Sequence, residues 1–360
     1  MITNDGKQLE PDALVLTQPV NLVLPRQAFV GLQVGRGFAA LIVLLFHNSL
    51  IFESEKYWNN GFYNGIFGFG HSGVEFFFVL SGFIICYAHR KDIGRSSQAA
   101  QYALKRLIRV FPIYWIMTTI LFFAMIASGN AQNNLLISSY LLLGFENNAI
   151  IPVAWTLFHE VLFYLLFAIL IYNKIFGSIA LGTWFFTCFL RLDMPPLHYI
   201  FDPINLLFGL GMTAFFISEC EKKIFGGVTL GVALFFAVAI EDMYIKTLSS
   251  TSLSFCYGIA SVFFVLGAIS SERLGNFRAL PGLPLLGDAS YSLYLIHYPL
   301  LSLLAKIFMA VSVLRALPHF ISFGLLTLLC IAAALACNLW VEKPILRYLG
   351  NKFSPSRASN

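Results

Sequence analysis

The stretch SGVEFFFVLSGFIICYAH, residues 72–89, determines the fold class of this chain. It contains a single carboxylate, Glu75, and otherwise consists mostly of Phe, Ile, Val, Leu and small residues. A transmembrane helix needs about 20 mostly apolar residues, so this stretch is long enough to cross a bilayer. It predicts a membrane-spanning helix with one acidic side chain near its outer end.

The rest of the chain has the same apolar character. Of 360 residues, 58% are hydrophobic and 11% are charged, whereas a soluble domain carries about 25% charged residues. A soluble fold could not bury so much apolar surface, so lipid must solvate part of it. The sequence predicts an all-α, polytopic integral membrane protein of about ten transmembrane helices, with a further segment, 135–145, that is too short to span. The expected spans are 34–52, 72–89, 108–127, 154–173, 175–190, 200–218, 224–240, 251–270, 287–309 and 319–341.

The distribution of Lys and Arg predicts the orientation. With ten spans and both termini in the cytoplasm, 18 of the 23 basic residues lie on the cytoplasmic side, as the positive-inside rule requires. We expect a cytoplasmic polar tail at 1–30, a transmembrane domain at 31–345 and a cytoplasmic tail at 346–360, with no appended soluble domain. The basic residues are dispersed over short loops, which suits anionic lipid headgroups and gives no support to nucleic-acid binding. None of the six cysteines forms a CxxC pair, so no metal site is expected.

Ionisable residues inside the spans are the first functional candidates, because they are costly to place in a membrane. Arg36 and His47 lie about three helical turns apart, so they share one face of the first span at a separation of about 16 Å. Glu160 follows Trp155 on the fourth span, at a depth that makes His47 a candidate partner. A snorkelling Arg36 and a hydrogen-bonded core His47 are the structural alternatives.

Other polar residues accompany this set. Arg106 and Arg109, at i and i+3, face the same way at the cytoplasmic end of the third span, where guanidinium groups suit phosphates. Positive-inside topology alone would also place arginines there. A salt bridge at the membrane rim is the favoured interpretation of Glu342 and Lys343. The remaining candidates are Glu75, Ser81, Trp155, Tyr291 and His297. Helix packing, an ion pair at the membrane rim or a hydrogen bond in the core would also explain these residues.

Five of these segments, in this order, resemble the large bacterial acyltransferase family three. That family includes O-acetyltransferases of lipopolysaccharide O-antigen and acyltransferases of exopolysaccharide production. Some relatives carry a further hydrolase-like domain outside the membrane, which is not expected here. The Leu32-Gln33 lead into Arg36 and the 70–73 stretch look closest to the exopolysaccharide branch. The segments are Arg36 with His47, FFFVLSGF at 76–83, Arg106 with Arg109 before Phe111-Pro112, Trp155-Thr156-Leu157 before Glu160, and SYSLYL at 290–295 before His297.

The resemblance implies a multi-pass protein of the bacterial cytoplasmic (inner) membrane. Its donor would be cytoplasmic acyl-CoA, with acetyl-CoA expected, and its acceptor a sugar hydroxyl of an extracytoplasmic or lipid-linked polysaccharide. It implies no tightly bound cofactor and allows for partners in polysaccharide synthesis.

With this donor and acceptor, the residues supply a consistent mechanism. Arg106 and Arg109 would hold the CoA phosphates, and Arg36 would line the donor path or neutralise charge that develops on the thioester. His47 would act as a base or as a transient acyl carrier, and Glu160 would orient its imidazole.

Two other classes of function stay open. A proton-coupled transporter or flippase of a polysaccharide or lipid intermediate is one, because intramembrane His, Glu and Arg also build proton relays. We find no convincing internal repeat of the kind that many transporters contain. A non-catalytic scaffold is the other, and it predicts that His47 is dispensable. Binding of acyl-CoA distinguishes the acyltransferase from both.

Overall fold

The computed structural model describes residues 29–129, 133–143, 149–191, 198–220, 224–279 and 281–353. These residues form helices and no strand, which confirms the all-α prediction. Nine helices in the described ranges are long and apolar enough to cross a membrane, and the apolar helix α7 (Lys174–Phe189) is shorter. This agrees with the prediction of about ten spans. Residues 1–28 and 354–360, which hold most of the two expected tails, lie outside the described residues.

The helices follow the predicted spans closely in position. Short helical segments connect or extend them: α2 (Asn64–Phe67), η1 (Gly68–Ser72), α5 (Asn133–Tyr140), η2 (Pro152–Ala154), η3 (Pro203–Asn205), η4 (Glu241–Ile245), α11 (Leu283–Asp288), α13 (Ser312–Arg315), η5 (Asn338–Glu342) and α15 (Lys343–Lys352). The long helices are α1 (Val30–Glu53), α3 (Gly73–His89), α4 (Ser96–Ala127), α6 (Trp155–Tyr172), α8 (Leu206–Cys220), α9 (Gly227–Ile240), α10 (Ser250–Arg273), α12 (Ser290–Ala310) and α14 (His319–Cys337).

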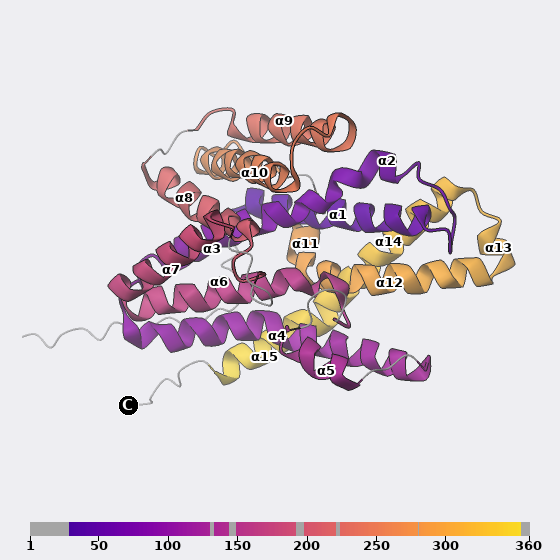
Figure 1. Ribbon diagram of the computed structural model, residues 1–360, viewed down its shortest axis with the longest axis horizontal. Helices are drawn as coiled ribbons and strands as arrows, with labels where there is room; N and C mark the ends of the chain where they lie inside the picture. The colour runs from indigo at the N-terminus through magenta and orange to yellow at the C-terminus, as the bar shows by residue number, and fades with distance from the viewer. Residues whose placement is uncertain are drawn as a thin grey trace, which may run out of the picture.

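Helix α1 has a central position in the bundle. In Figure 1, α9 and α10 lie along one side of the molecule, α4, α5 and α15 lie along the opposite side, and α1 and α6 run between them. Helix α1 contacts α3, α10, α11, α12 and α14. Polar side chains of α1 are therefore directed into protein rather than into lipid, as intramembrane charges require.

Glycines bring α3 and α8 into direct backbone contact. A Cβ atom at Gly82 would lie 2.1 Å from the carbonyl oxygen of Phe208, and one at Gly211 would lie 1.9 Å from that of Val79. Small residues allow such close approach between membrane helices. This contact holds Ser81, which precedes Gly82, at a defined depth beside α6 and α8.

The third predicted span, 108–127, is part of a longer helix. Helix α4 begins at Ser96 and has 32 residues. The added segment, residues 96–107, is rich in Ala, Gln, Leu, Lys and Arg, which favour helix even where the chain is polar. Arg106 and Arg109 thus lie within a continuous helix and not at its start.

Two segments outside the long helices pack against α4. The segment expected to be too short to span contains α5, and Tyr114 and Trp115 of α4 donate hydrogen bonds of 2.6 and 3.1 Å to the carbonyls of Ser139 and Tyr140. Residues 144 and 145 of that segment lie outside the described residues. Residues 346–352, the start of the expected cytoplasmic tail, belong to the helix α15, which contacts α4. Apolar residues at helical spacing explain this helix, because they give it one face to bury.

Candidate active site

A pair of histidines joins α1 to α12. The ring of His47 lies 4.8 Å, centroid to centroid, from the ring of His297. Nε2 of His297 lies 3.2 Å from Nδ1 of His47, which also lies 2.9 Å from the carbonyl oxygen of Val43. Nδ1 of His297 lies 3.0 Å from the carbonyl oxygen of Leu293. The structure therefore brings together two residues that the sequence singled out separately.

These partners define the protonation of both rings. A carbonyl oxygen can only accept, so Nδ1 carries the hydrogen in His47 and in His297. Nε2 of His297 then accepts from Nδ1 of His47, in a bond shared with Val43. No hydrogen-bond partner within the described residues reaches Nε2 of His47, and this atom is not fully buried. In its neutral form His47 thus has one basic nitrogen, Nε2, without a partner among the described residues.

Aromatic rings surround the pair. Phe46 lies 5.0 Å and Tyr298 lies 5.4 Å from the ring of His47, both edge to face. His297 is 1% exposed, whereas His47 is only partly buried. The pair therefore has one ring held inside the bundle and one ring that an incoming molecule can reach.

The side chain of Glu160, on α6, is directed towards α3. Its carboxylate accepts hydrogen bonds from the hydroxyls of Tyr164 and, at 3.3 Å, of Ser81. The structure thus joins Glu160 to Ser81, two candidates from different spans. In the part of the chain that the structure describes, no hydrogen bond links Glu160 to His47, whose ring is oriented by His297 instead.

Arg106 and Arg109 have separate surroundings. The guanidinium of Arg106 lies 5.6 Å from the ring centroids of both Tyr102 and Tyr164, and it donates to Nε2 of His89 at 3.0 Å. Arg109 forms an ion pair with Glu342 at 2.5 Å and lies over the ring of Tyr291 at 5.3 Å. The i, i+3 spacing does not therefore direct both side chains to one ligand in this structure.

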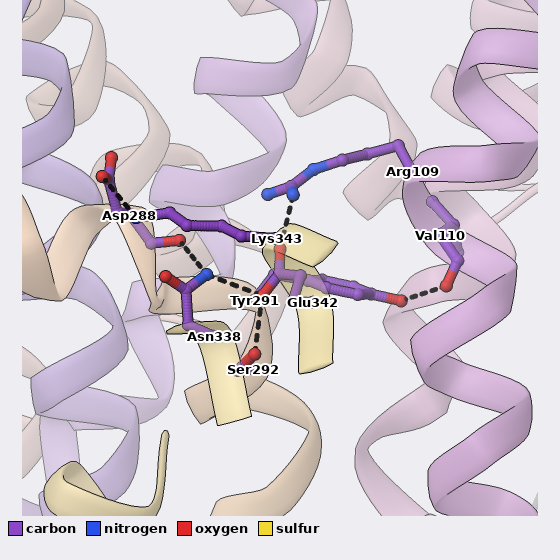
Figure 2. A network of polar contacts seen from close by, with 8 residues as sticks. All are labelled: Arg109, Val110, Asp288, Tyr291, Ser292, Asn338, Glu342 and Lys343. Atoms are coloured by element: carbon purple, nitrogen blue, oxygen red, sulfur yellow. Dashed lines mark hydrogen bonds and ion pairs between the residues drawn. The ribbon is translucent and has the colours of Figure 1, made fainter. Parts of the chain in front are cut away.

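The ion pair of Arg109 belongs to a network that Figure 2 shows. Glu342 is 0% exposed, and its second carboxylate oxygen accepts from Ser292 at 2.6 Å and from Asn338 at 3.0 Å. Lys343 pairs with Asp288 at 3.3 Å. Salt bridges thus do form at this end of the last span, as predicted, but Glu342 is buried rather than at a rim.

Tyr291 ties the same region to α4, because its hydroxyl donates to the carbonyl of Val110 at 2.6 Å (Figure 2). Arg36 is partly buried close to this network, within electrostatic reach of Arg109, Glu342 and Glu160. Two arginines and two glutamates thus share the middle of the bundle, and their opposite charges offset one another.

Glu75 lies deeper than predicted. A Cβ atom at Gly73 would lie 2.5 Å from the carbonyl oxygen of Ala39, and one at Gly35 would lie 2.6 Å from the ring of Phe76. Glu75 is therefore level with the turn of α1 that contains Arg36, about 15 Å along α1 from His47. Predicting depth from the span boundary alone was wrong because α1 and α3 are offset along their axes.

The surroundings of Glu75 include residues that sequence reasoning missed. Its carboxylate, 4% exposed, accepts from Ser254 at 2.9 Å. One turn before it, Nε2 of His71 lies 2.9 Å from Asp242, which also accepts from Tyr257 at 3.0 Å. Ser254 also lines an open cleft of about 260 Å³ between η3 and the start of α10. No local pattern marks these residues, because they come from three separate elements.

Trp155, the remaining candidate, lies at the start of α6. Its side chain is 37% exposed, and its ring lies 5.6 Å from that of His159. His159 is buried and contacts Oδ1 of Asn205 through Nδ1 at 2.8 Å. Trp155 therefore covers a core histidine and lies apart from the histidine pair.

Known proteins resemble this chain over most of its length. A family model described as an acyltransferase domain matches residues 29–338. The exopolysaccharide production protein ExoZ of Rhizobium meliloti (strain 1021) is 31% identical over 309 residues, which cover 78% of this chain and 91% of that protein. The O-acetyltransferase OatA of Staphylococcus aureus (strain NCTC 8325 / PS 47) is 25% identical over 350 residues, which cover 84% of this chain but 53% of OatA. No solved structure matches the chain.

Proposed function

This chain belongs to the acyltransferase family whose model matches residues 29–338, and from that premise we propose that it moves an acyl group from acyl-CoA to a sugar hydroxyl of an extracytoplasmic or lipid-linked polysaccharide. Family membership and the apolar helices make the chain a membrane-embedded acyltransferase. The similarity to ExoZ, an exopolysaccharide production protein, supports a polysaccharide acceptor, and the similarity to OatA, an O-acetyltransferase, supports transfer to a hydroxyl oxygen. Acetyl-CoA as the donor, the bacterial cytoplasmic membrane and partners in polysaccharide synthesis are part of the proposal.

The free Nε2 of His47 is the observation that carries this proposal. It would take the proton of the sugar hydroxyl as the hydroxyl oxygen attacks the thioester carbonyl. The carbon–sulfur bond then breaks, and the CoA thiolate takes the proton back from the imidazolium. A transient acyl group on the same nitrogen is a second route, because a neutral imidazole is also a nucleophile.

His297 would support either route by holding the ring of His47. Its Nε2 accepts from Nδ1 of His47, so the basic lone pair stays on Nε2, the atom that faces incoming molecules. An orienting acceptor of this kind also stabilises the imidazolium that forms during proton transfer. Sequence reasoning gave this role to Glu160, which here has other partners.

The charged groups on the cytoplasmic side of His47 would bind and guide the acyl-CoA donor. Arg106 suits the CoA phosphates because its charge is not paired with a carboxylate among the described residues. Arg36, with Glu160 nearby, would line the path of the thioester towards His47. Arg109 would hold Glu342 and so keep α4 against the end of α14.

Transfer of label tests the proposal. Membrane vesicles that contain the protein would receive radiolabelled acetyl-CoA and exopolysaccharide of the host, de-O-acylated by mild alkali. We expect label in the polysaccharide, and a loss of about 10²–10⁴ in rate with His47→Ala. His319→Ala is the matched control, because that exposed ring contacts Asn60 away from the pair.

A proton-coupled transporter or flippase gives the opposite outcome. Buried histidine pairs also suit proton relays, so the pair alone does not distinguish the two functions. A transporter would leave acetyl-CoA untouched and would transfer no label. Substantial transfer by a well-expressed His47→Ala protein would remove His47 from the mechanism.

A further inference from the structure

Among the described residues, no carboxylate pairs with Arg106. The guanidinium lies in a partly buried position between the rings of Tyr102 and Tyr164. Across the described ranges, its one hydrogen-bond acceptor is His89, and its Nε is buried without a partner. A partly buried charge is costly unless it is paired. The unused donors of this fork are therefore suited to an anion from outside the chain.

Arg109, one turn further along α4, is different. Its charge is met by the buried carboxylate of Glu342 at 2.5 Å. Of the two arginines, Arg106 is the one whose charge no carboxylate among the described residues compensates. A phosphate ligand would gain more from Arg106 for this reason.

A second layer of contacts orients Arg106. A guanidinium can only donate, so Nε2 of His89 must accept from Arg106, at 3.0 Å. The hydrogen of this imidazole is then on Nδ1, which donates to Oδ2 of Asp92 at 2.8 Å. The ring of Tyr102, 4.8 Å from that of His89 and edge to face, packs against the imidazole. Asp92, His89 and Arg106 thus form one line of hydrogen bonds with a single consistent direction.

We propose that Asp92 and His89 are positioning residues that hold the guanidinium of Arg106 as the phosphate-binding group for the acyl-CoA donor. This inference rests on the proposed function, because it takes the donor from it. His89 fixes one edge of the fork, and the two tyrosine rings fix its plane. Without His89, the long side chain would have to lose its rotational freedom each time the donor binds.

Steady-state kinetics with acetyl-CoA, in purified protein reconstituted in nanodiscs, tests the proposal. His89→Ala and Asp92→Leu should raise the KM for acetyl-CoA by about fivefold to tenfold, from the cost of immobilising one long side chain, with kcat within about twofold. His89→Gln should restore part of the affinity, because its amide can accept from Arg106 and donate to Asp92. His319→Ala is the control.

The outcomes separate this proposal from the proposed function. An unchanged KM, or a fall in kcat alone, in well-folded His89→Ala and Asp92→Leu proteins would overturn the positioning role. Leucine is close to aspartate in size but has no acceptor for Nδ1 of His89, so Asp92→Leu keeps the test informative if His89→Ala fails to fold. Equilibrium binding of CoA, measured without acceptor, gives an independent readout. CoA could bind the wild type, and bind these variants more weakly, without any acylation of glycan. That result would support the phosphate site and contradict the transfer reaction. If the wild type binds no CoA, both proposals fall.

Discussion

The single accepting atom on His297, Nε2, holds the ring of His47, whose Nε2 is the proposed reactive nitrogen. The ring of His297 is buried, and its two nitrogens are committed, one to Leu293 and one to His47. His47 can therefore rotate or change tautomer only by breaking a hydrogen bond that water does not readily replace at this depth. Orientation of this kind affects the rate of proton transfer more than it affects substrate binding.

His297→Phe tests this orientation. Phenylalanine keeps the ring and its packing but removes Nε2, so Nδ1 of His47 loses one of its two acceptors. We expect kcat to fall at least about tenfold while the KM for acetyl-CoA stays within about twofold. Tyr298→Phe, a neighbouring ring on the same helix with no hydrogen bond to His47, is the control. Full activity of a folded His297→Phe protein would mean that Val43 alone orients His47.

At the scale of elements, an ion pair between Arg109 and Glu342 joins α4 to η5. Glu342 also accepts from Ser292 of α12, so one carboxylate holds three elements together (Figure 2). The π-helical turn η5 widens the helix between Cys337 and Lys343. It brings the side-chain amide of Asn338 within hydrogen-bond distance of the carboxylate of Glu342. The contributions of the two side chains to stability are strongly coupled, because removing either one leaves the charge of the other unpaired.

Replacing the two partners one at a time and together measures this coupling. Arg109→Met or Glu342→Leu alone should cost about 3–5 kcal/mol of stability, because each leaves an unpaired buried charge. The double variant should be more stable than either single variant, since no charge then remains. Thermal unfolding followed by size-exclusion chromatography would give the order. Additive losses in the double variant would contradict strong coupling between the two side chains.

The glycine contact between α3 and α8 is a second feature of this scale. Gly211→Leu would drive a side chain into the backbone of Val79, so α8 would have to move away from α3. We expect a loss of about 1–3 kcal/mol or more, seen as a lower unfolding temperature and less protein in the membrane. Gly182→Leu on α7 is the matched control, because no atom within the described residues lies within 4 Å of a Cβ there. Equal stability of the two variants would show that α8 shifts without cost.

For the whole molecule, the orientation in the membrane stays a prediction from the basic residues. Both termini and the turn between α3 and α4 should be cytoplasmic, because that arrangement places 18 of the 23 basic residues on the cytoplasmic side. The donor site at Arg106 would then face the compartment that contains acyl-CoA.

Reporter fusions test the orientation. A fluorescent protein that folds only in the cytoplasm should be active after Ser354, and alkaline phosphatase, which folds only outside, should be inactive there. Fusions after Asn59, between α1 and α2, should give the reverse pattern. Phosphatase activity after Ser354 would overturn the layout and would place Arg106 on the wrong side for a cytoplasmic donor.

The sequence alone determined the class of the molecule and most of its helices. Whether a stretch can cross a bilayer depends on its length and apolar content, which are local and additive, so the predicted spans correspond to the observed helices. The same logic identified Arg36, His47, Glu160 and His297, because an ionisable residue in an apolar run stands out without any knowledge of its neighbours. The start of α4 was missed, since helix formation does not stop where the apolar run ends.

Only the tertiary structure decided which of these residues meet. Helices that are apolar all round carry little periodic signal, so the sequence does not tell which face is turned towards which neighbour. His47 contacts His297 and Arg109 contacts Glu342, partners 250 and 233 positions away, whereas the sequence favoured Glu160 for His47 and the CoA phosphates for Arg109. Depth was also decided by packing: the offset between α1 and α3 put Glu75 level with Arg36. Rotation and offset of a helix depend on contacts with all its neighbours at once, and no single stretch of sequence contains them.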